Sequence, residues 1–450
     1  MTDRIHDRLL GDARVDACFA GRAQLQAMLD VEAALADAEA AVGVVPVTCV
    51  QPIRAAARAD FYDLAAIAEG AAHGGIPAVP VVRHLTAQVA ASDPEAARYV
   101  HWGATSQDIM DTGLVLQLRE AVPVACDHIQ RASRAAADLS RRYADTPMAG
   151  RTWLQQATPV SFGLKAAAWL DALHRVRLRV LTAFDATQVL QFGGATGTLA
   201  SLGSEGPAVA DALASRLGLR TSDIPWHAHR DRLADLACAL GVAVGSVGKV
   251  ATDLGLMAQT EVSEVWERPA EGRGGSSTMP HKRNPVGVSV ALAAAARAPA
   301  LVATVLGAMA HEHERGLGGW QAEWDAVPDL VRTAAGGAKG LGDALDGLVV
   351  DPDRMRVNAD LTGGLVLAEA VAMALAPALG KAEAHACIGA ACRRARDEAR
   401  PLADVLADDS MVTPHLDHAA IARCLTPEHY LGAAHVFIER VLARYAEHGR

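Results

Sequence analysis

Aromatic residues are scarce in this chain, making up 4% of its 450 residues. Runs of β-branched residues are scarce as well, whereas Ala and Leu dominate an apolar set that reaches 51%. Alanine and leucine favour helices, while β-branched and aromatic residues favour strands. The composition therefore favours helices over sheets. Because 450 residues are too many for one ordinary core, we expect two or three domains.

Several kinds of segment are also missing. We find no uninterrupted apolar run of membrane-spanning length, and the N-terminus has no apolar core of an export signal. Long basic tracts are absent from a chain of net charge −10, which argues against nucleic-acid binding. The seven cysteines lack metal-ligand spacing and indicate reduced thiols. We therefore expect a cytoplasmic protein that binds neither membranes nor nucleic acid.

Long helical segments are predicted in the middle of the sequence. From Leu240 to Ala258, apolar residues recur at alternating spacings of three and four, the pattern of packed helices. Helices apolar over so much of their surface are buried on several sides, so we expect a bundle that packs against other subunits. An amphipathic helix is predicted earlier, from Arg22 to Val42, with Gly43 ending it. The other long apolar segments are Phe162 to Ala183, Val286 to Met309 and Leu330 to Leu348.

The most informative loop covers residues 274–285, which read Gly-Gly-Ser-Ser-Thr-Met-Pro-His-Lys-Arg-Asn-Pro. Glycine and proline break regular structure, so a loop is predicted. Its polar side chains suit no buried core, but they can bind and deprotonate a small carboxylate; they are Ser276, Ser277, Lys282 and Asn284. A solvated loop is the alternative. From Gly275 onward the order matches every fixed position of GSSxMPxKxNP, so the chain resembles the fumarase/aspartase superfamily.

A second segment, His101 to Thr112, matches another characteristic region of the superfamily. Thr105, Ser106 and Gln107 offer short hydrogen-bonding groups just before a predicted helix. A helix N-terminus has free N–H groups that favour anions. Ordinary N-capping is the alternative. Together with the signature loop, the segment favours carboxylate binding.

The third segment, Gly150-Arg-Thr-Trp-Leu-Gln-Gln156, departs from the superfamily at one residue. Many relatives have a histidine, commonly assigned to proton transfer, where this chain has Trp153. A leaving amine or hydroxide needs a proton, but a leaving carboxylate is a stable anion and needs little such help. The departure therefore suggests a carboxylate or another acidic leaving group. The alternative is that Trp153 only packs against the core.

The fourth segment, His311-Glu-His-Glu-Arg315, has the alternation that can suggest a metal site. On a helix, His311 and His313 would point to different faces, and the HExxH motif is absent, so no metal is expected. Arg315 has a fork that matches carboxylate geometry. A surface salt bridge to a nearby glutamate is the alternative.

With Asp360-Leu-Thr-Gly-Gly-Leu365 and Tyr430-Leu-Gly432, these segments are similar over nearly the whole chain to the bacterial 3-carboxy-cis,cis-muconate cycloisomerases of the superfamily. The resemblance implies an all-helical subunit of three domains: 1–108, a long-helix bundle at 109–346 with the signature loop at 272–285, and 347–450. It also implies a homotetramer with a twenty-helix core and active sites built from three chains. No cofactor is implied, since nothing is oxidised.

The implied activity is the reversible closure of 3-carboxy-cis,cis-muconate to 4-carboxymuconolactone, in aromatic breakdown through protocatechuate. By analogy, Ser276 is the base in the elimination direction, Lys282 helps to stabilise the developing charge, and His101 orients substrate or relays a proton. The residues expected to bind the small polycarboxylate substrate are Thr105, Ser106, Gln107, Arg151, Thr152, Trp153, Gln155, Ser277, Met279, Asn284 and Arg315.

Two other functions stay open at this point. A lyase on the same scaffold would release fumarate from a substituted succinate of the nitrosuccinate or adenylosuccinate type. Trp153 argues against a basic amine as leaving group but not against nitrite. A non-catalytic helical scaffold is compatible with the composition, although a scaffold has no use for Ser276, Lys282 and Asn284 in that order.

Overall fold

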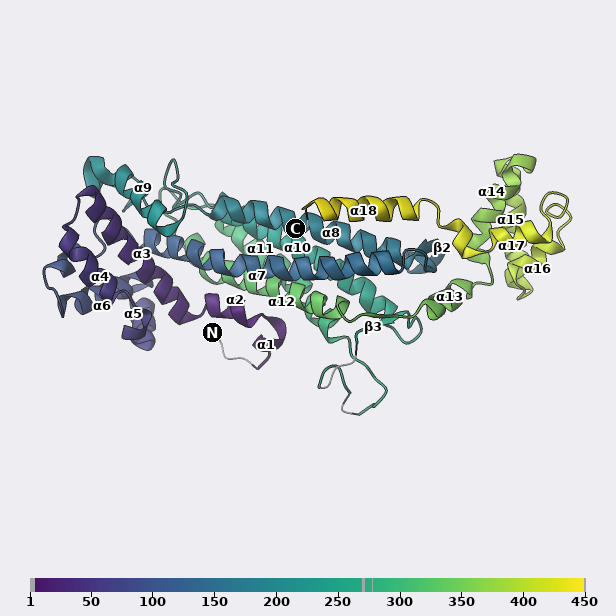
Figure 1. Cartoon of the computed structure of the whole chain (residues 1–450), viewed down its shortest axis with the longest axis horizontal. Helices are drawn as coiled ribbons and strands as arrows, with labels where there is room; N and C mark the ends of the chain where they lie inside the picture. Colours follow the sequence, from purple (N-terminus) through teal and green to yellow (C-terminus); the bar gives the residue numbers. More distant parts are fainter. Residues whose placement is uncertain (1–4, 269–271, 277, 449–450) are drawn as a thin grey trace. The chain divides into compact units, whose positions relative to one another are not determined.

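Helices dominate the computed structural model, which describes residues 5–268, 272–276 and 278–448 (Figure 1). Within these residues the only strands are two short antiparallel pairs. The prediction of an all-α protein is confirmed. The paired strands are β1 (Pro147–Thr152) with β2 (Gln155–Ser161), and β3 (Val265–Trp266) with β4 (Val349–Val350).

The chain forms two compact units, and each is assembled from three segments. The first consists of Met1–His128, Val176–Gly248 and Val290–Lys339, and the second of Ile129–Arg175, Lys249–Ser289 and Gly340–Arg450. The division into three domains at residues 108 and 346 stays a prediction. The five long helices contribute residues to both units; they are α7 (Ser106–Arg142), α8 (Phe162–Thr187), α10 (Asp231–Met257), α11 (Val286–Ala308) and α12 (Gly319–Leu345).

In the first unit, the predicted amphipathic helix is confirmed as α3 (Gly21–Val42). Gly43 ends it in the left-handed conformation, with φ of 87°, and its amide donates to the Ala40 carbonyl, as in a common helix C-cap. The remaining elements of this unit are α1 (Asp7–Leu10), α2 (Ala13–Cys18), η1 (Val47–Cys49), α4 (Val50–Ala56), η2 (Ala59–Phe61), α5 (Leu64–Gly74), α6 (Ala78–Ala90), η3 (Ala96–Tyr99), η4 (Ala200–Glu205) and α9 (Gly206–Leu217).

Glycines allow the long helices of the first unit to approach closely. A Cβ at Gly248 of α10 would lie 2.5 Å from the Ala295 side chain of α11, and one at Gly337 of α12 would lie 2.6 Å from Ala294. Real Cβ atoms do not come so near, so larger residues at these positions would force the helices apart. The predicted long-helix bundle therefore depends on small residues as much as on its apolar stripe.

The predicted start of α12 at Leu330 was wrong. The helix begins at Gly319 and contains Pro328. Trp320 and Trp324, four residues apart, extend the buried helical face upstream of the proline, and their rings pack edge to face at 5.0 Å. The helix thus continues through Pro328, and its first turns, before Leu330, were missed.

Two helices, α10 and residues 286–307 of α11, are long and apolar enough to cross a membrane by length and composition. The expectation that no such segment exists was therefore wrong. Within the chain, 61% of the most apolar stretch of α10 is buried, but only 33% of that of α11. Much of the most apolar stretch of α11 is thus not fully buried within its own chain.

A β-hairpin in the second unit is the main feature that the sequence did not predict. Thr152 pairs with Gln155, so Trp153 and Leu154 form a two-residue turn with φ of 53° and 61°. Such turns favour Asn-Gly, which this chain lacks here. Cys387 and Cys392 are partly buried and pack against the core of the C-terminal helices. The other elements are α13 (Pro352–Asp360), η5 (Leu365–Leu367), α14 (Ala368–Leu379), α15 (Lys381–Asp397), α16 (Leu402–Ala407), α17 (His418–Cys424), η6 (Pro427–Tyr430) and α18 (Ala434–His448).

One carboxyl group is buried in α3 without a partner. The Glu39 side chain is fully buried, and neither of its oxygens forms a hydrogen bond within the described residues. Burial, with a smaller contribution from Glu32, raises the pKa of Glu39 from 4.5 to about 9. Glu39 is therefore uncharged at neutral pH.

Replacing Glu39 by glutamine is expected to stabilise the chain at neutral and alkaline pH. The folded wild type holds a proton that the unfolded chain releases above pH 4.5, so its stability falls as pH rises toward 9. Between about pH 5 and pH 8 the loss is about 2–4 kcal/mol relative to the variant. Thermal unfolding at fixed protein concentration measures it, with the exposed Glu69→Gln as control. Parallel pH curves for wild type and Glu39→Gln would mean that Glu39 is ionised in the folded chain.

Candidate active site

Asp108 fixes the start of α7 in the first unit. Its carboxylate accepts from the Thr105 backbone N–H at 3.0 Å, which is the capping-box contact between the N3 side chain and the N-cap amide. The cap therefore comes from Asp108, and the Thr105 hydroxyl is not used for it. The other donors to Asp108 are Gly193 N (3.0 Å), Gly194 N (2.9 Å), Gln191 Nε2 (3.1 Å) and His227 Nε2 (2.7 Å).

Arg315 brings together three of the predicted carboxylate-binding residues. Its guanidinium donates to Thr105 Oγ1 at 2.8 Å, Ser106 Oγ at 3.3 Å and Gln107 Oε1 at 3.1 Å. Because arginine only donates, all three oxygens act as acceptors, and the hydroxyl protons of Thr105 and Ser106 stay available to another group. One cation and two outward-donating hydroxyls suit a carboxylate ligand.

Gln107 has a different environment from its neighbours. It is fully buried, and its Nε2 donates to Asp111 Oδ2 at 3.1 Å and to the His227 carbonyl at 2.9 Å. With its amide oxygen bonded to Arg315, both ends of the side chain are occupied. These contacts support a positioning role for Gln107, and direct substrate binding by it stays a prediction.

A buried ion network lies beneath this cluster. Arg230 is fully buried and donates to Asp111 at 2.6 and 3.1 Å and to Glu323 at 2.6 Å. Asp111 also accepts from Trp320 Nε1 at 3.0 Å. Burial disfavours the charge of Arg230, but the two carboxylates outweigh it and raise the pKa of the guanidinium. The network holds α7, the 226–230 segment and α12 together, and Asp111 connects it to Gln107 of the Arg315 cluster.

The His311–Arg315 segment is a loop rather than a helix. The His311 side chain is fully buried, 3.8 Å from Glu323, and burial together with Arg230 lowers its pKa. Among the described residues no group of three or more His, Cys, Asp or Glu side chains is arranged to hold a metal ion.

His101 pairs with a glutamate that sequence reasoning did not identify. Its Nδ1 lies 2.6 Å from Glu32 Oε1; the Glu32 side chain is 1% exposed and that of His101 20%. Burial opposes the charge of His101, but Glu32 and, more weakly, Asp108 raise its pKa overall.

In the second unit, the hairpin carries the third predicted segment. Arg151 donates to both oxygens of the buried Glu264, at 2.9 and 2.6 Å, which anchors β1. Thr152, Trp153 and Gln155 are exposed at the tip, and Trp153 is 95% exposed. Trp153 therefore does not pack against the core of its own chain, so that alternative was wrong.

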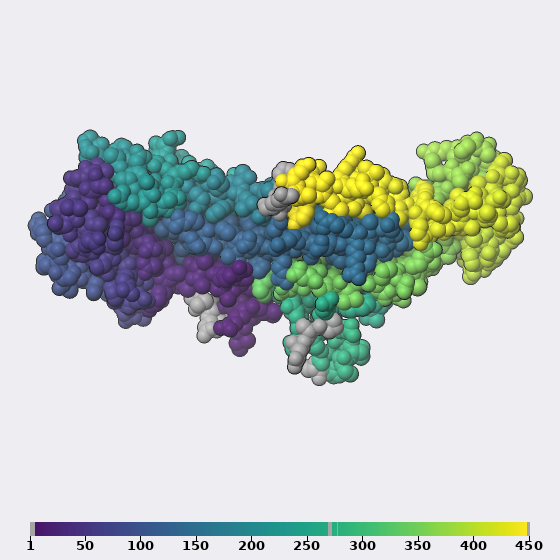
Figure 2. Space-filling model, in the orientation of Figure 1, coloured from purple at the N-terminus to yellow at the C-terminus, as the bar shows by residue number. Residues whose placement is uncertain are grey.

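The signature loop also belongs to the second unit. Ser276 Oγ accepts two backbone N–H groups of the same loop, from Met279 at 2.9 Å and Thr278 at 3.3 Å. Two donors on one hydroxyl oxygen lower the energy of its alkoxide. Lys282, Asn284 and Met279 are exposed, and Figure 2 shows this green part of the chain projecting at the surface. Ser277 lies outside the described residues.

Backbone contacts fix the base of the signature loop. The Asn284 N–H donates to the Gly274 carbonyl at 2.8 Å, and a Cβ at Gly274 would lie 2.7 Å from the Asn284 carbonyl oxygen. Gly274 also has φ of 72°, which favours glycine. Glu267 accepts from the first N–H groups of α11, those of Gly287 and Val288.

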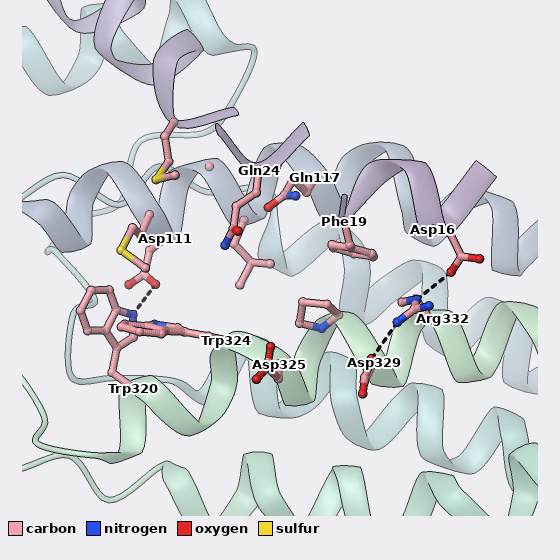
Figure 3. A pocket seen from close by; sticks show the side chains of 15 residues that line it. Asp16, Phe19, Gln24, Asp111, Gln117, Trp320, Trp324, Asp325, Asp329 and Arg332 are labelled. Carbon is pink, nitrogen blue, oxygen red and sulfur yellow. Dashed lines mark hydrogen bonds and ion pairs between the residues drawn. The ribbon is translucent and has the colours of Figure 1, made fainter. Parts of the chain in front are cut away.

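A cavity of about 420 Å³ lies between α7 and α12 of the first unit (Figure 3). Arg332 pairs there with Asp16 at 2.6 Å and Asp329 at 3.1 Å, so the guanidinium of this cavity already has two carboxylate partners. None of the predicted site residues lines it, and we do not assign it to the reaction. The lining is completed by Phe19, Gln24, Met28, Met110, Asp111, Gly113, Leu114, Gln117, Trp320, Trp324, Asp325 and Pro328.

The sequence gives little indication of the residues that hold the predicted site residues in place. Asp108 and Asp111 lie inside a segment that resembles the superfamily, but neither was predicted to act. Arg230 meets its partners across 119 and 93 residues, and Arg151 meets Glu264 across 113. No local spacing reveals pairs so distant, and a basic residue near a histidine was the only signal at Arg230.

Comparison with known proteins defines the class. Residues 12–299 match the family described as Lyase, and residues 364–441 match the adenylosuccinate lyase C-terminus. The chain belongs to this lyase family and is an enzyme of the fumarase/aspartase superfamily.

Three relatives narrow the comparison. A 3-carboxy-cis,cis-muconate cycloisomerase of Pseudomonas aeruginosa is 52% identical over 98% of this chain and 96% of its own. The crystal structure of the 3-carboxy-cis,cis-muconate lactonizing enzyme of Pseudomonas putida superposes with a TM-score of 0.94, at 45% identity and 99% coverage of both chains. A nitrosuccinate lyase of Streptomyces davaonensis is 42% identical over 95% of this chain and 92% of its own.

Proposed function

We propose that this enzyme interconverts 3-carboxy-cis,cis-muconate and 4-carboxymuconolactone, in the breakdown of aromatic compounds through protocatechuate. The observation that carries the proposal is the loop geometry at Ser276, in a chain 52% identical to a cycloisomerase of this name. The cluster of Thr105, Ser106 and Arg315 supports a substrate with several carboxylates.

The elimination direction shows what each group does. Ser276, as alkoxide, takes a proton from the carbon next to a carboxylate, a carbon–carbon double bond forms, and the lactone C–O bond breaks with its electron pair going to oxygen. A serine oxygen is a poor base unless its negative charge is stabilised, and the two N–H donors supply that. Lys282 and Asn284 meet the charge that develops on the neighbouring carboxylate. Lactonisation runs the same steps backwards, and no electron acceptor is needed.

The leaving group explains the tryptophan at position 153. The oxygen that departs is a carboxylate, which needs no proton from a general acid. An exposed indole at the hairpin tip can shield the reacting groups from water without donating to oxygen. The lack of a histidine here is therefore compatible with the proposed reaction.

We also propose a cytoplasmic homotetramer with a twenty-helix core and active sites built from three chains. The apolar stretch of α11, much of which is not fully buried within its own chain, supports it, as do Trp153 and Leu154, which are 95% and 83% exposed. Apolar patches of this kind mark surfaces that another chain covers. Further apolar side chains exposed on the long helices are Leu178, Val242, Leu256, Leu292 and Leu306.

A second candidate function is supported by one relative and one residue. The nitrosuccinate lyase is 42% identical to this chain, and Trp153 suits nitrite, an acidic leaving group, as well as a carboxylate. Ultraviolet absorbance separates the two functions. Purified enzyme mixed with 3-carboxy-cis,cis-muconate is expected to remove the conjugated-diene signal. An unchanged signal, with fumarate released from nitrosuccinate, would replace the first proposal by the second.

Replacing Arg315 by lysine is expected to lower kcat/KM about 10- to 100-fold, mainly through KM. Lysine keeps the charge but loses the fork that holds the Thr105 and Ser106 oxygens, and a charged hydrogen bond is worth about 1.5–3 kcal/mol. Steady-state kinetics with 3-carboxy-cis,cis-muconate measures it. The control is Arg98→Lys at the exposed pair with Glu95. Equal kinetics in both variants would remove Arg315 from substrate binding.

A further inference from the structure

The Glu32–His101 pair has the form of a buried carboxylate behind an accessible imidazole. Glu32 is held inside α3 and contacts Nδ1 of His101 at 2.6 Å. Within the described residues, Nε2 of His101 has no hydrogen bond or ion pair, and the side chain keeps 20% of its surface exposed. The second ring nitrogen is thus the one available to a ligand.

The backbone around His101 has a left-handed conformation that is held by packing. His101 has φ of 59°, and Gly103 follows with φ of 73°. A Cβ at Gly103 would lie 2.6 Å from the Leu202 side chain, so the loop passes where only glycine fits. Trp102 is held against Tyr99, with ring centroids 5.6 Å apart. A histidine kept in the left-handed region by such packing is a candidate for function.

Glu39 is a second buried acid on the same helix as Glu32. Glu39 lies seven residues after Glu32, two turns along the same face of α3, and is buried without a partner among the described residues. Its protonated state leaves Glu32 as the single negative charge of this pair of acids. A neutral neighbour costs Glu32 no repulsion, so the carboxylate of Glu32 is free to hold a cation.

We propose that Glu32 is a positioning residue that keeps His101 as an imidazolium, with Nε2–H directed outward to the substrate carboxylate that leaves in lactone opening and attacks in lactonisation. This inference rests on the proposed function. The C–O bonding pair goes to the carboxylate oxygen, which accepts a hydrogen bond from Nε2. No proton is transferred, because a carboxylate is a much weaker base than imidazole. His101 thereby supplies positive charge at the leaving group, where Trp153 cannot.

The charged groups that act on His101 come from two helices. Glu32 on α3 is in direct contact with it, and Asp108 on α7 acts at longer range. Asp108 already accepts from five donors, which disperse its charge. Glu32 is therefore the group whose removal changes the protonation of His101 most.

The test measures the titration of His101 directly. Protein labelled with ¹³C in the histidine rings is titrated by NMR as wild type and as Glu32→Gln, with His101→Asn identifying the signal. Glutamine keeps an acceptor for Nδ1–H but removes the charge, so the pKa of His101 is expected to fall by about one unit or more. The alkaline limb of kcat/KM for 3-carboxy-cis,cis-muconate is expected to move to lower pH by the same amount, and Glu32→Asp to restore part of the shift.

An unchanged pKa of His101 in Glu32→Gln would overturn the proposal, as would a pH–rate profile that does not move with that pKa. A wild type inactive on 3-carboxy-cis,cis-muconate would instead contradict the proposed function, and the titration would still decide whether Glu32 holds the charge of His101. Thermal unfolding of each variant verifies that it is folded, and Glu32→Ala, which also removes the charge, replaces Glu32→Gln if the latter is not.

Discussion

Ser276→Ala is expected to lower turnover of 3-carboxy-cis,cis-muconate by about 10²- to 10⁴-fold, the usual contribution of a proton-transfer group. The variant keeps the loop backbone, including the contact between Asn284 N and Gly274 O, but removes the oxygen on which two N–H groups converge. The lower turnover should appear in kcat rather than in KM. We assign Ser276 to the transfer of the proton, and substrate binding to the cluster of Thr105, Ser106 and Arg315. Loss of diene absorbance measures it, and gel filtration verifies that assembly is unchanged.

Ser289→Ala is the matched control for Ser276→Ala. Ser289 is an exposed serine in the first turn of α11, and its hydroxyl donates to the Val286 carbonyl at 2.8 Å. Its removal deletes the same atom without touching the signature loop, so nearly full activity is expected. If Ser276→Ala were as active as Ser289→Ala, another group would have to take the proton.

Arg230→Leu is expected to lower the free energy of unfolding by about 3–5 kcal/mol. The variant leaves Asp111 and Glu323 buried without their cation, and burial already raises the pKa of Glu323. Uncompensated carboxylates of this kind take up protons or draw water into the core. Urea unfolding followed by circular dichroism measures the change, at a protein concentration kept equal for all variants.

Two further variants show whether the loss of charge pairing causes the effect of Arg230→Leu. Arg98→Gln breaks an exposed pair with Glu95, and its effect is expected to stay within about 0.5 kcal/mol. Replacing Arg230, Asp111 and Glu323 together by apolar residues is expected to recover much of the lost stability, because no charge is then left unpaired. Equal destabilisation by the single and triple variants would mean that packing, and not charge, governs this part of the core.

Most of the helices could be predicted from the helical periodicity of the sequence. The elements that were missed have local causes. The 3.6-residue pattern located α3, α8, α10, α11 and the later part of α12, but it did not give the length of α7. The hairpin at residues 147–161 went unnoticed because Trp153 and Leu154 are not typical turn residues. The start of α12 was misplaced because the uniformly apolar stretch begins only at Leu330, whereas the helix begins at Gly319. A helix that spans a membrane and a helix that is buried in a protein can have the same apolar composition. Composition alone therefore does not decide which of the two α11 is.

The residues of the candidate site could be predicted from the sequence where they are neighbours in the chain. The loop around Ser276 and the turn at Thr105 are short motifs, and both can be recognised from residue order alone. Glu32, Glu264 and Glu323 could not be recognised in this way, because a buried acid has no signature until its partner is found in space. Each meets its histidine or arginine across 69 to 113 residues. Chain topology, which spacing does not encode, creates these pairs.

The capping of α7 by Asp108 also has a consequence for substitutions. One side chain joins the first turn of α7, the glycines at 193 and 194 and His227, so a change at Asp108 disturbs all of these contacts at once. The tip at Trp153, in contrast, is almost free of contacts to its own chain. We therefore expect substitutions at Trp153 to leave the cluster of Arg315, Thr105 and Ser106 intact.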